Sequence, residues 1–395
     1  MKKKIIFMLI DMNIGGTEKA LLNMVSEFSL GEYDITILML EEHGGFLSYI
    51  PAGINIEYLK GYSSMKQALN QPPQVTAIDY FKEGELVKSF NIALLHLISK
   101  ITKNRSVFFK YVLNNQPVLD GEYDVAVAYA GPMDFISYFV VNKIKAKKKV
   151  QWIHFDVTKI GFNQAFASKT YIKFDKIFVV SEEAKNKLIN LVPALKERTK
   201  VFFNIVSSKM IHSQAKEGRA FPDEIDGLRI VTVGRLTNEK GQDLAIRVLA
   251  RLIDNGYKVK WYCVGEGKSR IEYEKLVVES NLQDKFIFLG ADPNPYPYIA
   301  ECDIYVQPSR YEGYCITLIE ARCLNRPIVT TDVNGAKEQI RNGETGLIVG
   351  INEHEIYQAV VQLIDNRDLC VKFSENLAQE NFDSKVEMNK IYNLI

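Results

Sequence analysis

The chain has 395 residues and carries 49 Lys and Arg against 48 Asp and Glu, a formal net charge of +1 at pH 7. With 47% hydrophobic and 25% charged residues it has the composition of a globular protein, and it is longer than one core usually holds. From this length we expect two domains. No run of about 18 apolar residues occurs, so we expect no membrane-spanning helix.

The charge is unevenly distributed along the chain. Residues 1–205 hold 26 Lys and Arg against 20 Asp and Glu, whereas residues 206–395 hold 23 against 28. This asymmetry predicts that only the first half faces an anionic surface. The five cysteines all follow residue 262, without a Cys-x-x-Cys pair or zinc spacing, which is typical of a reduced cytosolic protein.

The first half reads as strands alternating with helices. The opening "MKKKIIFMLIDMNIGG" has a basic start and an apolar run, but Asp11 interrupts it and no small-residue cleavage site follows, so we predict a buried strand rather than a signal peptide. A Gly15-Gly16 turn and an amphipathic helix capped by Thr17 come next. Further buried strands are predicted within residues 33–40, 123–130, 148–154 and 176–181.

The same alternation begins again after a polar stretch at about 205–226, which we predict to be a linker. Strands are predicted within residues 228–236, 258–267, 286–290, 303–309 and 327–332. Two Rossmann-like halves with parallel sheets follow from this pattern, and in such sheets ligands bind at the carboxyl ends of the strands. With two halves, the natural site is the cleft between them.

Residues 86–119 combine many apolar residues with Lys and Arg and contain no Asp or Glu. This composition is typical of a helix that lies on anionic lipid. A core-facing helix with solvated lysines, or a helical pair inserted toward the cleft, would look similar, so these alternatives stay open. The basic run 143–149 is interpreted as a solvated loop.

Three glycine- and charge-bearing loops follow predicted strands of the second half. In "VGRLTNEKG", Gly234 precedes Arg235 and Lys240, two cations that can hold a pyrophosphate at the mouth of a cleft. In "VGEGK", Gly265 and Gly267 would let the backbone approach a ligand. No G-x-G-x-x-G follows the first strand, which disfavours a nicotinamide-dependent enzyme.

The third loop, "PSRYEGYCITLIEA", gives the strongest signal. Glu312 lies in the loop, a helix is expected to begin near Cys315 or Ile316, and Glu320 lies about five residues inside it. Free N–H groups at a helix start attract an anion, and carboxylates accept hydrogen bonds from vicinal hydroxyls. Two well-separated carboxylates beside an anion site suit a polyol–phosphate–polyol ligand, such as a nucleoside-diphosphate sugar.

With these motifs the chain resembles a glycosyltransferase of family 4. The matching stretches run along nearly the whole chain: "GGTEKALLNM", "WIHFD", "VVSEEAK", "FFNIV", "GRLTNEKG", "VGEG", "PSRYEGYCITLIEA" and "RPIVTTDVNGAKEQIRNGETGLIV". The resemblance implies an α/β, GT-B fold, with two Rossmann-like domains facing each other across a cleft. It implies an acceptor domain at 1–205, a donor domain at 206–375 and a last helix at about 376–395 that packs back on the first domain.

The resemblance also implies roles for individual residues. Glu312 would contact the hydroxyls of the donor sugar, Glu320 the ribose, and Arg235 and Lys240 the pyrophosphate. His154 would reach the sugar from the first domain, although from the residues alone it reads more readily as a core histidine. Further donor contacts are implied at Gly15, Gly16, Gly234, Gly265, Gly267, Gly313, Tyr314, Cys315, Ile316 and Thr317. The family loop commonly has glycine where this chain has Cys315.

The expected reaction transfers a sugar, with retention, from a nucleotide-diphosphate sugar to a lipid-linked or surface-glycan acceptor. No D-x-D sequence occurs, so we expect neither a metal nor any other cofactor, and UDP is the expected carrier because it is the commonest. No nucleic-acid partner is expected, and the protein is expected in the cytoplasm, at the inner face of the membrane if residues 86–119 contact lipid. Asp156 is the best of three weak general-base candidates, beside Asp11 and Asp134.

Two alternatives keep the fold and change the role. One is a nucleotide-sugar epimerase or a storage-glucan synthase, although the loop "NIGGTEKA" lacks the lysine before the glycines that a glucan synthase would carry. The other is a non-catalytic partner subunit, which would be expected to have lost Glu320, Arg235 or Lys240. All three residues are present.

Overall fold

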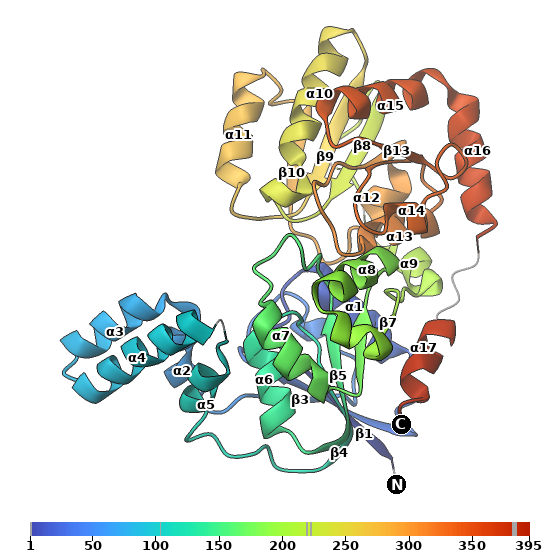
Figure 1. Cartoon of the computed structure of the whole chain (residues 1–395). Helices are drawn as coiled ribbons and strands as arrows, with labels where there is room; N and C mark the ends of the chain where they lie inside the picture. Colours follow the sequence, from blue (N-terminus) through green and yellow to red (C-terminus); the bar gives the residue numbers. More distant parts are fainter. Residues whose placement is uncertain (1, 103, 219, 222, 381–384) are drawn as a thin grey trace. The chain divides into compact units, whose positions relative to one another are not determined.

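The computed structural model describes residues 2–102, 104–218, 220–221, 223–380 and 385–395. Its contacts divide the chain into two compact units (Figure 1). Unit 1 comprises Met1–Met12, Val25–Phe202 and Asn389–Ile395, and unit 2 comprises Asn13–Met24 and Phe203–Met388. The expected first domain, residues 1–205, differs from unit 1 chiefly at Asn13–Met24, whose contacts group with unit 2.

Unit 1 is built on a seven-stranded parallel sheet with the strand order β3-β2-β1-β4-β5-β6-β7. Its strands are β1 (Lys3–Leu9), β2 (Tyr33–Met39), β3 (Asn55–Tyr58), β4 (Tyr123–Ala128), β5 (Ala146–Ile153), β6 (Lys176–Val179) and β7 (Thr199–Val201). Residues Ile5–Met8 of β1 are fully buried, because helices cover a doubly wound parallel sheet on both faces. The apolar run at the start of the chain is therefore a buried strand, as the sequence predicts, and it lies between β2 and β4 in the sheet.

The helices of unit 1 fall into two groups. One group follows the strands of the sheet: α6 (Asp134–Lys143), α7 (Gln164–Thr170) and α8 (Glu182–Leu191), of which α6 packs on β1, β4 and β5. The other group lies between β3 and β4: α2 (Tyr62–Asn70), α3 (Pro73–Lys82), α4 (Leu86–Thr102) and α5 (Ser106–Val112). In Figure 1 this second group extends away from the sheet, with α3 and α4 packed side by side. We call it the helical layer.

Unit 2 contains a six-stranded parallel sheet with the order β10-β9-β8-β11-β12-β13. The strands are β8 (Leu228–Val233), β9 (Val259–Val264), β10 (Phe286–Gly290), β11 (Ile304–Gln307), β12 (Ile328–Thr331) and β13 (Leu347–Val349). The helices are α9 (Ser208–Gln214), α10 (Gln242–Asp254), α11 (Arg270–Glu279), α12 (Tyr296–Glu301), α13 (Ile316–Cys323), α14 (Ala336–Gln339), α15 (Glu353–Asp365) and α16 (Arg367–Ala378).

Alternate residues of these strands enter two separate cores. Trp261 and Cys263 of β9 pack with α10, α11 and α15 on one face, whereas Tyr262 and Val264 pack with α12 and α13 on the other. This is the period-two alternation of a strand. Because both faces are buried, the strands read as continuous apolar runs, which is why the sequence predicts them well.

The structure differs from the sequence expectations at several places. The helix α1 (Gly16–Ser26) begins one residue before Thr17, so Thr17 is not its cap. The stretch at 205–226 is not a bare linker, since it contains α9, which is capped by the Ser207 hydroxyl. The strands β3, β7 and β13 were not expected, because each has only three or four residues and lacks a long apolar run.

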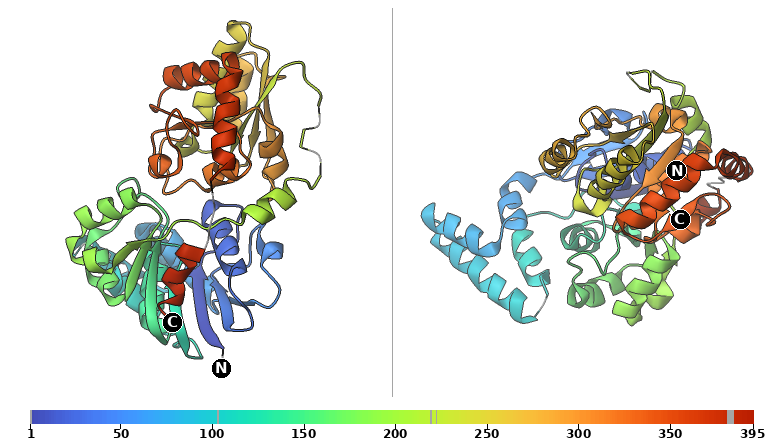
Figure 2. Two further views of the ribbon diagram at one scale, coloured as in Figure 1. Left: turned by 90° about the vertical axis from the view of Figure 1, so that its right-hand side faces the viewer. Right: turned by 90° about the horizontal axis from the view of Figure 1, so that it is seen from above.

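The segment Asn389–Ile395, which includes the end of α17 (Lys385–Tyr392), belongs to unit 1. There the Tyr392 ring stacks on Tyr33 at 5.5 Å between centroids and meets Phe28 edge-on. Lys390 donates a hydrogen bond to the Val201 carbonyl at 3.0 Å. Figure 2 shows this segment beside the sheet of unit 1. The expectation that the last helix packs on the first domain falls partly on residues 381–384, which lie outside the described residues.

Candidate functional site

The site in unit 2 lies where the strand order of the sheet reverses. The strands β8 and β11 are neighbours in the sheet, although about 70 residues separate them in the chain. The loop after β8 carries Arg235 and Lys240, and the loop after β11 carries Glu312. Both loops leave the carboxyl ends of parallel strands, where open α/β sheets bind their ligands.

Lys240 and Glu312 form a buried ion pair across these two loops. The Lys240 Nζ donates to both carboxylate oxygens of Glu312, at 2.7 and 2.8 Å. Burial alone would lower the pKa of Lys240, but the negative charge of Glu312 and the hydrogen bond to it outweigh burial and raise that pKa. The ammonium therefore stays charged. The sequence placed these residues on two different parts of a ligand and did not predict their direct contact.

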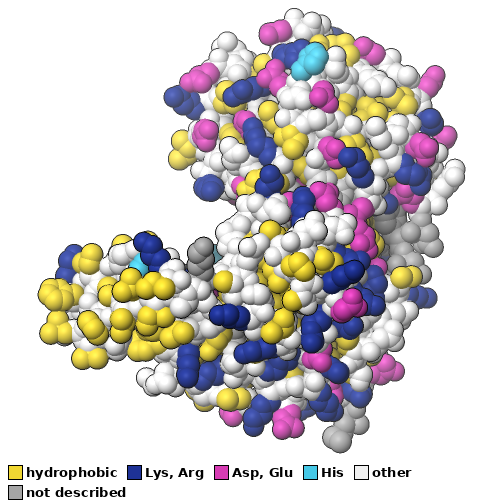
Figure 3. Space-filling model, in the orientation of Figure 1, with side chains coloured by type: hydrophobic (Ala, Val, Ile, Leu, Met, Phe, Trp, Pro, Cys, Tyr) yellow, Lys and Arg dark blue, Asp and Glu magenta, His cyan; other side chains and the backbone are white. Residues whose placement is uncertain are grey.

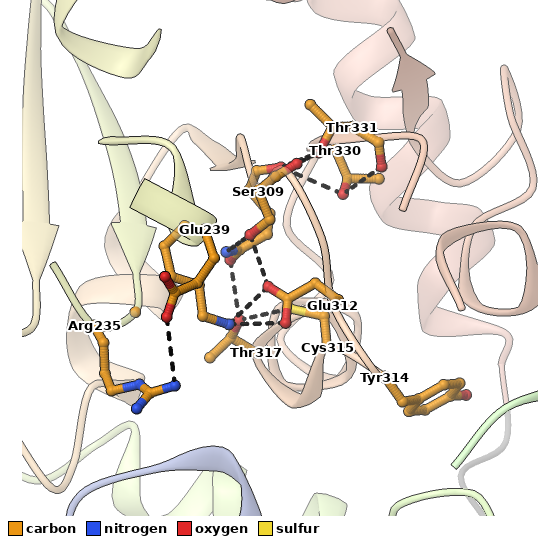
Figure 4. Close-up of polar contacts among 12 residues, drawn as sticks. Arg235, Glu239, Ser309, Glu312, Tyr314, Cys315, Thr317, Thr330 and Thr331 are labelled. Carbon is orange, nitrogen blue, oxygen red and sulfur yellow. Dashed lines mark hydrogen bonds and ion pairs between the residues drawn. The ribbon is translucent and has the colours of Figure 1, made fainter. Parts of the chain in front are cut away.

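A chain of hydrogen bonds holds Glu312 from the strand side (Figure 4). The Ser309 hydroxyl donates to Glu312 Oε1 at 2.7 Å, and Gln307 Nε2 donates to Ser309 Oγ at 2.9 Å. Tyr305 in turn donates to Gln307 Oε1 at 2.7 Å. Sequence reasoning missed this support, although polar residues at the end of an otherwise apolar strand, "IYVQPS", were a usable signal. The arrangement fixes the carboxylate before any ligand arrives.

The helix α13 begins at Ile316, with Cys315 at its N-cap, as the sequence predicts. The Cys315 side chain does not cap the helix but lies 3.1 Å from Thr317 Oγ1. Burial, together with the Glu312 charge, raises the pKa of the Cys315 thiol to about 12. Cys315 is therefore a buried neutral thiol that fills space beside the Lys240–Glu312 pair.

Tyr314 points away from this group (Figure 4). Its ring packs against Phe203, with centroids 5.4 Å apart. A Cβ added at Gly335 would lie 2.6 Å from the same ring, so glycine at 335, with φ +74°, makes room for it. The expected donor contact at position 314 is thus limited to its backbone, which neighbours Gly313.

Glu320 lies in the fifth position of α13 and is only 2% exposed. The Tyr296 hydroxyl donates to Glu320 Oε1 at 2.9 Å. Lys19, also in unit 2, lies 4.8 Å above the Tyr296 ring. Burial raises the pKa of Glu320, against the opposing charge of Lys19 and the Tyr296 hydrogen bond. Neither Tyr296 nor Lys19 was predicted, since each is far from Glu320 in the sequence.

Arg235 differs from Lys240 in its surroundings. Its side chain is 56% exposed and its NH2 group lies 3.8 Å from Glu239. A Cβ at Gly234 would lie 3.6 Å from the Lys240 side chain, which is an ordinary van der Waals contact, so the lysine passes close to the strand end. Arg235 is accessible to a ligand, whereas Lys240 is already paired.

Gly265 and Gly267, which follow β9, lie where a side chain would collide with the backbone of a neighbouring loop. A Cβ at Gly265 would collide with the Gly234 carbonyl, and one at Gly267 would meet the backbone of Leu236 at 2.4 Å. Glycine is therefore required at both positions by the backbone of the neighbouring loop, and the expected donor contacts at Gly265 and Gly267 stay a prediction. Gly16 of α1 packs near Ile316, 3.7 Å from where its Cβ would be.

His154 follows β5 in unit 1 and is 7% exposed. Its ring packs between aromatic neighbours: it stacks on Trp152 at 6.1 Å and meets Tyr129 edge-on at 4.6 Å between ring centroids. Burial lowers the pKa of His154 to about 3, although a hydrogen bond with the Tyr129 backbone opposes this. Its Nε2 atom is buried and has no hydrogen-bond partner among the residues that the structure describes. An orphaned buried nitrogen is unusual in a core histidine and fits a ligand contact.

Two of the weak general-base candidates, Asp156 and Asp134, are engaged in their own contacts within unit 1. Asp156 receives hydrogen bonds from the backbone N–H and hydroxyl of Thr158 and pairs with Lys187 at 2.9 Å. These contacts hold the loop after β5. Burial raises the pKa of Asp134 to about 6, against the charge of Arg105. Asp134 is the first residue of α6.

Residues 219–380 match the family model described as "Glycosyl transferases group 1". This part of the chain is similar to the glycosyl transferases of group 1. It covers nearly all of the site in unit 2, including Lys240, Glu312 and Glu320. The match agrees with the glycosyltransferase resemblance read from the sequence, and the assignment to family 4 stays a prediction.

Two curated relatives are informative. A Campylobacter jejuni protein named N-acetylgalactosamine-N,N'-diacetylbacillosaminyl-diphospho-undecaprenol 4-alpha-N-acetylgalactosaminyltransferase is 31% identical over 209 residues, 52% of this chain and 55% of that protein. The poly(ribitol-phosphate) alpha-N-acetylglucosaminyltransferase of Staphylococcus aureus is 24% identical over 293 residues, 73% of this chain and 57% of that protein. The chain thus spans about half the length of these curated relatives.

Among solved structures, Anabaena HepE in complex with UDP-glucose is similar over 99% of this chain and 98% of its own, with a TM-score of 0.73 and 17% identity. This likeness shows the fold. The two-sheet α/β, GT-B fold expected from the sequence is confirmed.

Proposed function

We propose that the protein is a glycosyltransferase that moves a sugar from a nucleotide-diphosphate sugar, with UDP as the carrier, to a lipid-linked or surface-glycan acceptor. The observation that carries this proposal is the Lys240–Glu312 pair at the start of α13, with Glu320 one turn further along the helix. Glu312 takes the hydroxyls of the donor sugar and Glu320 takes the ribose. The free N–H groups at the start of α13 and the exposed Arg235 take the diphosphate.

The leaving diphosphate is the group whose charge grows during transfer. Lys240 is already charged and buried beside the site, so it stabilises that charge without reorganising. Arg235 supplies a second, movable cation. We therefore propose that transfer needs no divalent metal. The relatives with "alpha" in their names support an α-linked product, which from an α-linked nucleotide sugar means retention of configuration.

His154 is proposed to contact the donor sugar through its orphaned Nε2. A pKa of about 3 keeps the ring neutral at physiological pH. It therefore acts as a hydrogen-bonding group and not as an acid.

The experiment that tests the proposal is a donor panel. UDP-, GDP-, ADP- and dTDP-sugars are compared by thermal shift and then by slow donor hydrolysis, with and without EDTA. UDP-sugars are expected to stabilise the protein most, and EDTA to leave hydrolysis unchanged. A strict need for a metal would contradict the charge argument, and conversion of the UDP-sugar into an epimer would favour the alternative of an epimerase. Binding without any turnover would favour a non-catalytic partner subunit.

The acceptor is proposed to be presented at a membrane. Among the described residues, no helix is long and apolar enough to cross one. The helix α4 nevertheless exposes a continuous apolar stripe, formed by Leu86, Val87, Phe90, Leu94, Leu97 and Ile101. Phe90 is 67% exposed and Ile101 73%. Figure 3 shows apolar side chains gathered over the helical layer.

Charge favours a lipid surface as the occupant of this stripe. Residues 73–112 contain six Lys and Arg against three Asp and Glu, and α4 itself contains no acidic residue. An apolar stripe flanked by cations binds anionic lipid. We expect vesicles containing phosphatidylglycerol to bind the protein, and Phe90→Asp to abolish binding. Equal binding to neutral and anionic vesicles would contradict this proposal.

A further inference from the structure

Unit 1 contains a cavity of about 970 Å³ between the helical layer and the segment 161–165. The layer contributes the end of α2, the start of α3 and the second half of α4, and the opposite wall leads into α7. A pocket of this volume is large enough for a small ligand. None of the roles assigned above uses it.

The charge of the cavity wall is one-sided. Lys100 and Arg105 line it together with His96, and no Asp or Glu is among the described lining residues, although the Asp134 carboxyl outside the wall interacts with the charge of Arg105. Arg105 also lies over the rings of Phe108 and Phe109, at 5.4 and 5.2 Å from their centroids. These ring contacts hold its guanidinium in place. Two neighbouring cations on one wall are suited to a phosphate or diphosphate group.

One polar group of the wall is unpaired. Among the residues that the structure describes, the buried Ser99 Oγ atom has no hydrogen-bond partner, and it lies on the same helix as Lys100. Asn70 and Gln71 add amide groups at the end of α2, while Phe108 and Phe162 add aromatic surface. An orphaned hydroxyl beside two cations and amides points to a ligand that is both anionic and rich in hydrogen-bonding groups.

The cavity lies on the side of the sheet where ligands bind. The helical layer follows the carboxyl end of β3, and the segment 161–165 follows that of β5, as His154 does. Lys100 stands next to Ile101 and close to Leu97, which belong to the exposed apolar stripe of α4. A ligand whose anionic head enters the cavity can therefore leave its apolar tail along that stripe.

We propose that this cavity binds the diphosphate of a polyprenyl-diphosphate-linked glycan acceptor, with the isoprenoid tail leaving along the apolar stripe of α4. This inference rests on the proposed transferase function and specifies its acceptor class. Lys100 and Arg105 hold the diphosphate, and Ser99 with the amides holds the first sugar. The membrane then delivers the tail and the cavity selects the head group.

The test uses the full chain and farnesyl diphosphate as a soluble probe, with binding measured by calorimetry. We expect farnesyl diphosphate to bind, farnesol to bind far more weakly, and saturating UDP not to displace the probe. Lys100→Ala is expected to weaken binding about threefold to tenfold, as for loss of one partly exposed charge-assisted contact. Lys100→Arg should retain it. The matched control is Lys110→Ala, an exposed cation of α5 that does not line the cavity.

Unchanged binding by Lys100→Ala, equal binding of farnesol, or displacement of the probe by UDP would each overturn the proposal. The last result would place the probe in the donor site. UDP binding is measured separately on every variant, so a failure of the donor assignment is recognised by loss of UDP binding alone. A protein that binds UDP but not farnesyl diphosphate keeps its proposed function and loses this acceptor site.

Discussion

Replacing Lys240 by methionine tests the central claim about the donor site, that one buried cation both stabilises Glu312 and neutralises the leaving diphosphate. The substitution keeps most of the side-chain volume and removes the charge. Glu312 is then left as a buried carboxylate whose remaining hydrogen bond comes from Ser309. Removing one partner of a buried ion pair costs about 3–5 kcal/mol.

For the Lys240–Glu312 pair we expect a loss of stability at or just below the lower end of that range. The Lys240 side chain is 19% exposed and that of Glu312 8%, and Ser309 still supports the carboxylate. We therefore expect the free energy of unfolding of unit 2 to fall by about 2–3 kcal/mol. Glu312→Gln in the same background removes the uncompensated charge and should restore about 1–2 kcal/mol. Activity should stay about 10²–10³ below the parent in both variants, because the diphosphate has lost the buried one of its two cations.

Urea unfolding followed by tryptophan fluorescence measures the stability term. The chain has two tryptophans, Trp152 in unit 1 and the fully buried Trp261 in unit 2, so Trp152→Phe gives a background that reports on unit 2 alone. UDP release measures the activity. The reasoning is refuted if Lys240→Met changes neither stability nor turnover, or if Glu312→Gln restores both together.

Three further outcomes follow from the site. Glu320→Gln keeps the shape of the side chain and its Tyr296 contact but should weaken UDP binding about tenfold, as for loss of a charged hydrogen bond. An unchanged Kd by calorimetry would show that Glu320 does not bind the ribose. In the folded protein the His154 ring stays neutral down to its pKa of about 3, whereas in the unfolded chain it takes up a proton below about pH 6.5. The free energy of unfolding should therefore fall by up to about 1.4 kcal/mol per pH unit as the pH falls from 6.5 toward 3. A His154→Gln variant with the same acid sensitivity would contradict this. The Cys315 thiol, with a pKa raised to about 12 by burial, should resist iodoacetamide at pH 8 until the protein unfolds, and rapid alkylation followed by mass spectrometry would show that it is open to solvent.

The long strands and the loops that follow them could be predicted from the sequence, because strands buried on both faces leave uninterrupted apolar runs. The start of α13 and the places of Glu312 and Glu320 were predicted to within a residue, because the apolar strand β11 marks where the loop before this helix begins. The short strands β3 and β13 were not, since three or four residues at the edge of a sheet carry too little periodicity.

The contacts of the site were harder to predict than its members. The pair of Lys240 with Glu312 joins residues 72 apart in the chain, and only the adjacency of β8 and β11 brings them together. Nothing local in the sequence encodes that adjacency. The packing at Gly265 was also not predicted, since a Cβ there would collide with the backbone carbonyl of Gly234 in the neighbouring loop.

The division of the chain into two units has a consequence for its synthesis. Unit 2 takes Asn13–Met24 from the beginning of the chain, and unit 1 takes Asn389–Ile395 from the far end. The ring of Tyr392 can therefore reach Tyr33 only after nearly all 395 residues have left the ribosome. Unit 1 cannot complete its native contacts before Asn389–Ile395 has been synthesised, and two fragments divided near residue 203 would each lack a piece held by the other.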